Sequence, residues 1–361
     1  MLDFSGKQIN KSIFSDLCDV SLGKFSPYIK PEEAATVKFS CRNKFRQNIV
    51  TCKDHSIESF INEVEGLTFD VSLQTHLKTL PHYIPIIDYR TALRISLPES
   101  IEFIGISLVD IIKSGFSFKA GRIHESDKIV YRESLFKHSK LKDKKIILFL
   151  TGPDTYIEGV WYKRETSGFL NTIKTMNFHA VTGFNFSVFG GECAFSQIFN
   201  LKKSLYSAYL LEQNHIKCIP HIYALDQFQT KRWIDCFKAN PKIEYITMNC
   251  QFQKSQKNNK ELIETIKFIL TELPYLHIIL QGFPFSQIEN FAYFLNRIHF
   301  AEKKATKSAF GFKQMEFNAS NKKFSTTQRS KELKRINPLD LIARNIIARK
   351  RYLKSIHNRN L

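Results

Sequence analysis

Short apolar runs alternate with helical patterns between residues 83 and 301. Continuous apolar runs are typical of strands buried on both faces, and their alternation with helices predicts parallel βαβ units. Eight candidate strands fit a (βα)8 TIM-like barrel in the α/β class. A doubly wound open sheet fits less well, because no glycine-rich nucleotide turn follows the first strand. The eight runs are "YIPIID" (83–88), "IEFIGIS" (101–107), "KIILFLT" (145–151), "FHAVTG" (178–183), "IKCIPHIY" (216–223), "IEYITMN" (243–249), "LHIILQG" (276–282) and "RIHFA" (297–301).

The rest of the sequence pattern predicts helices and divides the chain into three regions. Residues 1–80 read as an N-terminal cap region that includes the helical spacing of "SIESFINEVEGL", residues 81–301 as the barrel, and residues 302–361 as a basic tail. Helix "TKRWIDCFKAN" ends near Asn240-Pro241, because proline stops a helix. The other predicted barrel helices are "SQIFNLKKSLYSAYLLEQ" (196–213), "NKELIETIKFILTE" (259–272) and "FSQIENFAYFLN" (285–296).

The tail itself divides into two patterns. Residues 302–337 read as a basic, largely irregular segment, and "NPLDLIARNIIARKRYLKSIHNRN" then predicts a helix with Asn337 as N-cap and Pro338 in the first turn. We expect its apolar stripe to dock on the barrel and its basic face to meet a polyanion. A membrane-surface helix and a purely structural helix are the alternatives. The candidate nucleic-acid contacts are Arg344, Arg349, Lys350, Arg351 and Lys354.

Charge strengthens the polyanion interpretation. The formal net charge is +19, and residues 302–361 contain 16 lysines and arginines against 4 acidic residues, whereas residues 1–80 balance ten against ten. A localised basic excess is the footprint expected for a nucleic-acid partner, whether DNA or RNA. A solvated tail that aids solubility is the alternative.

Candidate chemistry gathers where the predicted strands end, because a parallel αβ barrel carries its functional groups at the C-terminal ends of its strands. The supply is rich in amides and hydroxyls and poor in carboxylates. We take Asp88, Asp154, His221 and Asp226 as candidate catalytic residues. The candidate ligand-binding residues are Asn185, Ser187, Tyr223, Asn249, Gln251, Gln253 and Gln281.

These assignments compete with ordinary structural roles. In "VTGFNFSVFGGECAFSQIFNLKKSLY", glycines let a strand end turn tightly or approach a ligand, but Asn, Ser and Gly are also common loop residues. A lone histidine such as His221 is often only a hydrogen-bonded structural residue. No Walker motif, nucleophile elbow or zinc-protease motif is present. We predict no metal site, and the sequence identifies no cofactor.

The seven cysteines are scattered without a C-x-x-C pair, which argues against a zinc knuckle and predicts buried free thiols. No run of 18 apolar residues predicts a membrane span, and "MLDFSGKQINKSIF" lacks the apolar core of a signal peptide. We therefore expect a cytoplasmic protein.

Several motifs occur in the order typical of one family. "IGISLVDIIK", "ILFLTGPDTYIEGVWYKR", "AVTGFNFSVFGGECAFSQIFNLKKSL", "IKCIPHIYALDQFQTKRWIDCFKANPKIEYITMNCQFQ" and "LHIILQG" resemble a family of barrel proteins with a domain of unknown function, found in bacteria, phages and plasmids. The resemblance implies a barrel and a mobile-element setting but supplies no reaction. The matching positions are Asn185, Phe186, Ser187, Asn200, Lys202, Lys203, Pro220, His221, Trp233, Gln251, Phe252 and Gln253.

The chain departs from that pattern at two places. Gly183-Phe184 stands where a proline usually precedes Asn185, and Gln251 stands where the family often has glutamate. If that glutamate is catalytic, the change implies a weakened or binding-only member.

Two functions therefore remain open. The first is a nucleic-acid-associated barrel protein of a mobile element or defence system that acts on a base or nucleotide in the barrel mouth, as a transferase or hydrolase. The second is a non-catalytic nucleic-acid-binding or scaffold protein that uses its basic C-terminal tail.

Overall fold

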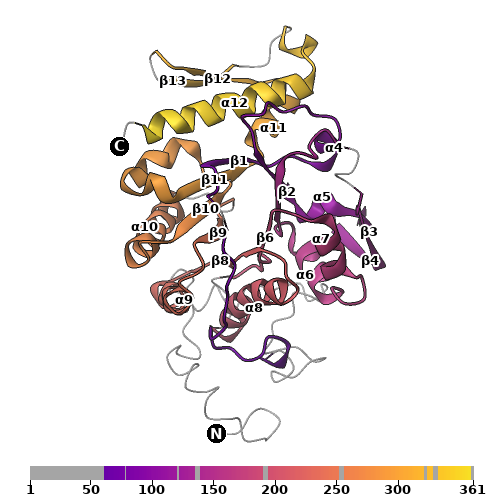
Figure 1. Ribbon diagram of the computed structural model, residues 1–361, viewed down its shortest axis with the longest axis vertical. Helices are drawn as coiled ribbons and strands as arrows, with labels where there is room; N and C mark the ends of the chain where they lie inside the picture. Colours follow the sequence, from indigo (N-terminus) through magenta and orange to yellow (C-terminus); the bar gives the residue numbers. More distant parts are fainter. Residues whose placement is uncertain are drawn as a thin grey trace, which may run out of the picture.

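Two parallel β-sheets with helices around them form the body of the protein (Figure 1). The computed structural model describes residues 61–77, 79–119, 122–134, 139–189, 194–251, 256–320, 323–327 and 332–358. The first sheet contains, in spatial order, β1 (Tyr83–Pro85), β11 (Ile298–Glu302), β10 (His277–Gln281), β9 (Tyr245–Asn249) and β8 (His221–Ile222). The second contains β2 (Phe103–Ser107), β5 (Lys145–Phe149), β6 (Ala180–Thr182) and β7 (Cys218–Ile219).

All eight predicted runs form these parallel strands, so the α/β class and the strand positions are confirmed. Only Pro220 separates β7 from β8, because proline has no N–H to donate to the ladder. At the other edges of the two sheets, Ile86 and Gly105 form a parallel bridge, and Ile87 N donates to Gly105 O at 3.0 Å. The two sheets therefore adjoin at both edges.

Gly105 permits this close approach. A Cβ atom at this position would lie 2.7 Å from Phe149 Cε2 and 2.8 Å from Ile86 Cγ1. Both distances are shorter than real Cβ contacts, so any larger residue would have to displace the Phe149 and Ile86 side chains.

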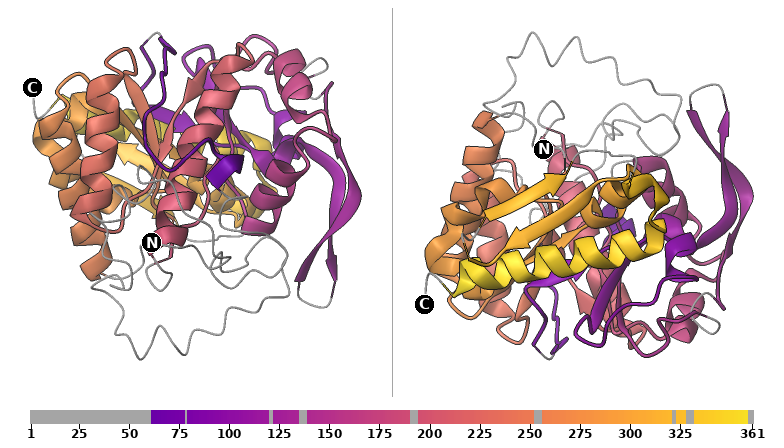
Figure 2. Two further views of the ribbon diagram at one scale, coloured as in Figure 1. Left: turned by 90° about the horizontal axis from the view of Figure 1, so that it is seen from below. Right: turned by 90° about the horizontal axis from the view of Figure 1, so that it is seen from above.

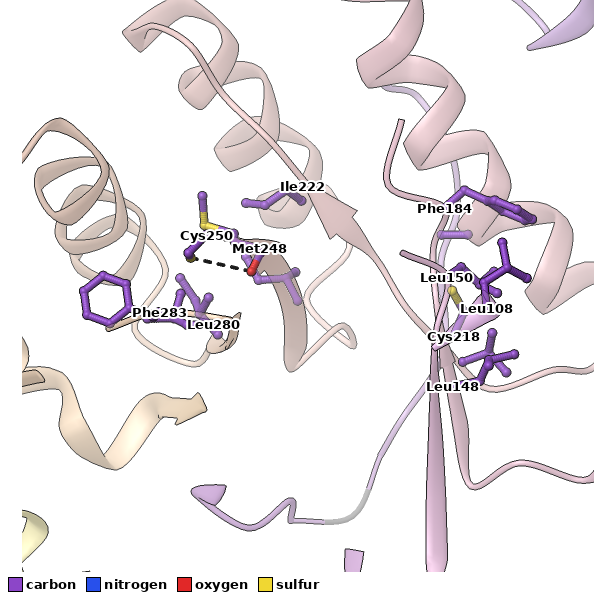
Figure 3. Close-up of a cluster of buried hydrophobic side chains, with 14 of the residues drawn as sticks. Leu108, Leu148, Leu150, Phe184, Cys218, Ile222, Met248, Cys250, Leu280 and Phe283 are labelled. Carbon is purple, nitrogen blue, oxygen red and sulfur yellow. Dashed lines mark hydrogen bonds between the residues drawn. The ribbon is translucent and has the colours of Figure 1, made fainter. Parts of the chain in front are cut away.

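Side chains alternate along each strand, and this alternation separates two apolar cores. One set from both sheets meets in an inner cluster that includes Ile84, Phe149, Ile219 and Ile279. The other set packs against the helices in the main core, where Figure 3 shows Leu148 and Leu150 on one sheet and Met248 and Leu280 on the other. The complete inner cluster is Leu77, Leu80, Ile84, Ile86, Phe103, Ile147, Phe149, Ala180, Ile219, Tyr245, Ile279 and Ala301.

The helices follow the predicted pattern in the second half of the chain. Helix α9 (Gln227–Ala239) ends before Asn240-Pro241 as predicted. One prediction needs refinement, because η2 (Phe285–Arg297) is a 3-10 helix that is kinked at Phe291. The remaining helices are α4 (Tyr89–Ala92), α5 (Leu108–Ile111), α6 (Asp154–Tyr162), α7 (Phe169–Met176), α8 (Ala194–Gln213) and α10 (Gln256–Glu272).

An antiparallel ribbon is inserted between the second and third parallel strands, and the sequence pattern missed it. Strands β3 (Ile112–Lys119) and β4 (Arg122–Tyr131) pair with two register irregularities. Figure 2 shows this ribbon along one side of the molecule, and its residues Ile129 and Tyr131 are buried in the main core. Gly115 adopts a φ of 124° next to the Ile129 backbone, a conformation that favours glycine.

The described part of the segment expected to be irregular forms regular elements, which corrects the sequence prediction. It contains α11 (Lys304–Phe310), the antiparallel strands β12 (Gln314–Asn318) and β13 (Lys323–Thr327), and η3 (Leu333–Arg335). Helix α12 (Pro338–His357) then begins as predicted, because the Asn337 side chain accepts a hydrogen bond from Leu339 N. Figures 1 and 2 show α12 lying along the β12–β13 hairpin.

Helix α12 belongs to the same main core as the sheets rather than to a separate tail. Its buried side chains Leu341, Ile342, Ile346, Leu353 and Ile356 join that core. Buried Asn345 adds specific bonds, since its Oδ1 accepts from Met315 N at 2.7 Å and its Nδ2 donates to Lys313 O at 3.0 Å. Removing residues 302–361 would therefore expose the core of the sheets.

Thr75, Leu77 and Leu80 of the N-terminal region pack against the N-terminal ends of the strands. Leu77 and Leu80 enter the inner cluster, and Leu80 N donates to the Tyr245 hydroxyl at 3.2 Å. Cys218 N donates to Thr75 Oγ1 at 3.2 Å. The first five residues of the predicted helix in "SIESFINEVEGL" (56–67) lie outside the described residues, and residues 61–63 are helical.

Two expectations from composition can be compared with the structure. Cys218, Cys236 and Cys250 are free and buried, which confirms the prediction for these three thiols; the other four cysteines lie outside the described residues. Among the helices that the structure describes, none is both long and apolar enough to cross a membrane.

Candidate functional site

Polar side chains cluster at the C-terminal ends of the parallel strands. Each stands two or four residues after a member of the inner cluster, so the alternation along a strand directs it to the same side. We call them the strand-end set. Its members are Asp88, Ser107, Thr151, Thr182, His221, Thr247, Asn249, Gln281 and Lys303.

One group within this set joins the first and last strands. Lys303 Nζ donates to Ser107 Oγ at 2.7 Å and to Asp110 Oδ2 at 3.2 Å, and Ser107 Oγ also donates to Asp110. Ser107 begins α5 and Asp110 accepts from the Ser107 N–H, so the two form a capping box. Lys303 therefore forms an ion pair with Asp110 as well as a hydrogen bond with Ser107.

Sequence reasoning missed this group. Ser107 is the last residue of the run "IEFIGIS" and Lys303 follows "RIHFA" by two residues, so the strand ends contained the signal for both. Their pairing spans 196 positions and needs the adjoining edges of the two sheets to be known.

Two arginines and a tyrosine extend the Lys303 group. Tyr89 N donates to Asp110 Oδ1 at 3.3 Å, and the guanidinium of Arg132 lies 3.9 Å from the centre of the Tyr89 ring. Arg90 Nε donates to the Tyr89 hydroxyl at 3.1 Å and thereby lowers the pKa of that phenol. Two arginines thus flank the Tyr89 side chain, and Lys303 pairs with Asp110. Cations beside an aromatic ring suit phosphate groups and a planar base.

Gln281 and Thr151 connect the two sheets across the strand-end set. Gln281 Nε2 donates to Thr151 Oγ1 at 2.7 Å, from β10 in one sheet to the residue after β5 in the other. Gln281 Oε1 is buried and accepts no hydrogen bond from the described residues. This amide oxygen can therefore accept from a ligand or from water.

His221 lies deeper in the same region. Its side chain is fully buried, and neither ring nitrogen has a hydrogen-bond partner among the described residues. Burial lowers the pKa of His221 to about 3, so the ring is neutral at pH 7. A neutral imidazole can accept a proton or a hydrogen bond, but no described carboxylate orients it as in a nucleophilic triad.

The three candidate catalytic aspartates are separated and engaged at helix starts. Asp88 accepts from Thr91 N at 3.0 Å as the N-cap of α4, and Asp226 accepts from Gln229 N at 2.8 Å as the N-cap of α9. Asp154 begins α6 and accepts from Ser187 Oγ at 2.6 Å. Each carboxylate thus has a structural partner, and the described contacts do not pair one aspartate with another.

Side-chain amides of α8 hold the stretch after β6. Asn200 Nδ2 donates to Ser187 O at 2.9 Å, and Gln197 Nε2 donates to Phe189 O at 3.1 Å. The backbone N–H of Asn185 donates to Leu150 O at 3.1 Å, and the Asn185 side chain is half-buried. Ser187 is occupied by Asp154, so of the two predicted ligand residues here Asn185 is the better placed.

The Lys-Lys step in α8 also has a structural explanation. Lys202 is 1% exposed and donates to Thr68 O at 2.7 Å, which ties α8 to the N-terminal region. Lys203 Nζ pairs with Glu158 at 2.6 Å and lies 4.3 Å from the centre of the Phe186 ring. Neither ammonium is available on the surface.

The remaining predicted ligand residues occupy different environments. Asn249 Oδ1 accepts from Gln251 N at 3.1 Å, and Gln251 is exposed beside Gly282. Tyr223 is partly buried, and its carbonyl accepts from Trp233 Nε1 at 2.8 Å. Gln253 lies outside the described residues.

The prediction of an exposed basic face on α12 is confirmed at three positions and is wrong at Arg349. Arg344, Arg351 and Lys354 are exposed, whereas Lys350 is partly buried and donates to Ser100 O. Arg349 is 1% exposed and pairs with Glu302, so it cannot reach a nucleic acid. Its position at the spacing Ile342, Ile346, Arg349 places it on the apolar stripe, a signal that the sequence contained.

No group of three or more His, Cys, Asp or Glu side chains in the described chain has an arrangement that could hold a metal ion.

The sequence matches no model of a known protein family, and the curated proteins include no match to it. The resemblance to the barrel family therefore stays a prediction from the sequence motifs.

Proposed function

We propose that this chain is a nucleic-acid-associated protein that holds the phosphate backbone on the exposed basic stripe of α12. The observation that carries the proposal is the division of α12 into two faces. One face is buried in the main core, whereas Arg344, Arg351 and Lys354 are exposed on the other. Because the core fixes the helix, these cations are presented on a rigid support.

Helix geometry supports a continuous contact. At about 100° per residue, Arg344, Arg351 and Lys354 lie within about 80° of one another around the helix. At about 1.5 Å per residue they span about 15 Å along the axis, which matches several phosphates of a strand. The exposed Lys334 and Arg335 before α12 extend the same basic region, which favours a polyanion over a single small anion.

We also propose that the two adjoining sheets form one closed (βα)8 barrel with the strand-end set at its mouth. The Ile86–Gly105 bridge and the continuity of the chain through Pro220 support this closure. The mouth would take a nucleotide or base of the bound nucleic acid. Lys303, Arg90 and Arg132 supply cations for its phosphate, and Gln281 supplies an unpaired amide oxygen for a base edge.

Two roles are open for the barrel mouth: catalysis on a nucleotide, and binding without turnover. The hydrogen bonds that the candidate aspartates already make favour binding without turnover. A base-exchange or glycosyl-transfer reaction needs a free carboxylate nucleophile. Asp88 and Asp226 cap helices and Asp154 accepts from Ser187, so each would have to give up a partner to react. A role in a mobile element or defence system, and a cytoplasmic location, are proposals that rest on the sequence alone.

The test is binding of the full-length chain to labelled single-stranded DNA, duplex DNA and RNA over a salt series. The variant R344Q/R351Q/K354Q removes three charges from the stripe, and K231Q/K242Q/K260Q removes three exposed charges elsewhere as the matched control. We expect a loss of affinity in the first variant only. Equal affinity of the two variants would overturn the proposal, because the contact would then depend on total charge and not on α12.

A further inference from the structure

A basic pocket lies at the N-terminal ends of β5, β6 and β7, away from the strand-end set. Its volume is about 720 Å³, within the range of small-molecule sites. Five lysines and two histidines are among its lining residues, and no aspartate or glutamate is. The seven basic residues are Lys142, Lys144, Lys145, Lys174, Lys217, His179 and His215.

Part of this charge is already compensated. Lys145 pairs with Glu102, and the pKa of that carboxyl is lowered by the hydrogen bond from Lys145. Lys144 Nζ donates to Pro98 O at 3.0 Å. Lys142, Lys174 and Lys217 are exposed and have no ion-pair partner among the described residues. Three exposed lysines thus line one concavity, and no described carboxylate pairs with them.

The rest of the lining adds an apolar side. Ile146, Ile173, Met176, Phe178 and Ile216 contribute to the wall. A site whose lining combines several cations with aliphatic and aromatic groups suits an anion that carries an organic body. Lysine ammonium groups bind phosphate as point charges, so three of them suit clustered phosphates more than a single carboxylate.

We propose that this pocket is a binding site for a phosphate-bearing ligand, held by Lys142, Lys174 and Lys217. It goes beyond the proposed role of α12 and does not require that role. The phosphate can come from a free nucleotide or from the end of a nucleic-acid strand. The second source is supported by a shared loop, because Lys144 of the pocket lining donates to Pro98 O and Lys350 of α12 donates to Ser100 O.

A competing explanation is that these lysines stabilise helix ends. Lys174 lies in the last turn of α7, where a cation compensates the negative end of the helix dipole. That role predicts a change in thermal stability when the lysine is replaced, and it predicts no change in ligand affinity. The experiment therefore measures both quantities.

Calorimetric titration of the full-length chain with pyrophosphate and with ATP tests the free-ligand source. Oligonucleotides with and without a 5′-phosphate test the strand-end source. The variant K174Q/K217Q should bind whichever phosphate ligand the protein takes about tenfold more weakly or worse, and K231Q/K260Q should match the wild type. Tighter binding of pyrophosphate or ATP would identify the ligand as a free nucleotide. Tighter binding of the 5′-phosphorylated strand would identify it as the end of a nucleic acid.

Two results would overturn the site. The first is no binding of any phosphate probe at low salt. The second is equal affinity of K174Q/K217Q and the control, with a lower melting temperature for K174Q/K217Q alone, which would assign the lysines to the helix ends. Failure of the α12 contact would appear separately, as equal nucleic-acid affinity of R344Q/R351Q/K354Q and K231Q/K242Q/K260Q, because those variants leave the pocket lysines intact.

Discussion

Arg349 of α12 and Glu302 at the end of β11 form an ion pair that is almost completely buried. Arg349 Nη2 donates to Glu302 Oε2 at 2.7 Å, and the two side chains are 1% and 6% exposed. The guanidinium also lies 3.5 Å from the centre of the Phe285 ring, and Tyr83 donates its hydroxyl to Glu302 at 3.3 Å. This pair fastens the C-terminal helix to the sheet.

Removing one partner of this pair should destabilise the whole chain. R349M would leave Glu302 buried without its counter-charge, and we expect a loss of about 3–5 kcal/mol in the free energy of unfolding. The double variant R349M/E302Q should recover part of that loss. Urea denaturation measures both, with R351M as the exposed control, expected within about 0.5 kcal/mol of wild type. A loss for R349M as small as that for R351M would contradict the buried pair.

Stability should fall with acid because two histidines are buried in neutral form. Burial lowers the pKa of both His221 and His299 to about 3, whereas an unfolded histidine has a pKa of about 6.5. The unfolded chain therefore binds more protons below pH 6.5. The contribution of these two neutral histidines to the free energy of unfolding is fully present above pH 6.5. It is lost as the pH falls towards 3, by roughly 1.4 kcal/mol per pH unit for each histidine.

Single variants separate these contributions. H221N and H299Q should each reduce the slope of unfolding free energy against pH between pH 6.5 and 4.5. The exposed His124 supplies the control, because H124Q removes a histidine that is accessible in both states. Slopes in both buried variants that match that of H124Q would show that neither ring resists protonation.

The aspartates assigned to helix starts should behave as caps. D226A removes the acceptor for Gln229 N, and we expect a loss of about 1 kcal/mol. D226N keeps an acceptor and should lose much less. D88A should resemble D226A, since Asp88 accepts from both Thr91 N and Thr91 Oγ1. Thermal or urea unfolding checks all three, and an unchanged D226A would remove the capping role.

Gly282 should tolerate alanine less well than Gly168. Both have positive φ, 76° and 65°, but a Cβ at Gly282 would collide with the Gln251 side chain, whereas nothing lies within 4 Å of that position at Gly168. G168A should therefore cost about 1 kcal/mol from backbone strain alone, and G282A should cost more. Adding Q251A to G282A should remove the difference. Equal losses for the two single variants would show that Gln251 moves aside freely.

The sequence predicted the parallel strands because each is a continuous apolar run, a pattern that burial on two faces imposes. The β3–β4 ribbon was missed because "IKSGFSFK" is partly exposed and lacks such a run. The β12–β13 hairpin was missed for the same reason, since most of "KFSTT" is exposed.

The candidate site was predictable only in part. Strand-end positions such as His221 and Gln281 follow from counting along a run, and the structure places both beside the inner cluster. Lys303 with Ser107 was not predictable, because a contact between residues 196 positions apart depends on tertiary packing. The burial of Arg349 could have been predicted, since it shares the spacing of the apolar stripe, but the charge alone suggested exposure.

The most direct test of the nucleic-acid proposal is the slope of log affinity against log salt concentration for duplex DNA. Each phosphate neutralised contributes about 0.9 to that slope, so loss of three contacts should reduce it by about 2.7. We predict that reduction for R344Q/R351Q/K354Q and little change for K231Q/K242Q/K260Q. The same slope in both variants, or no binding by the wild type at low salt, would contradict the account.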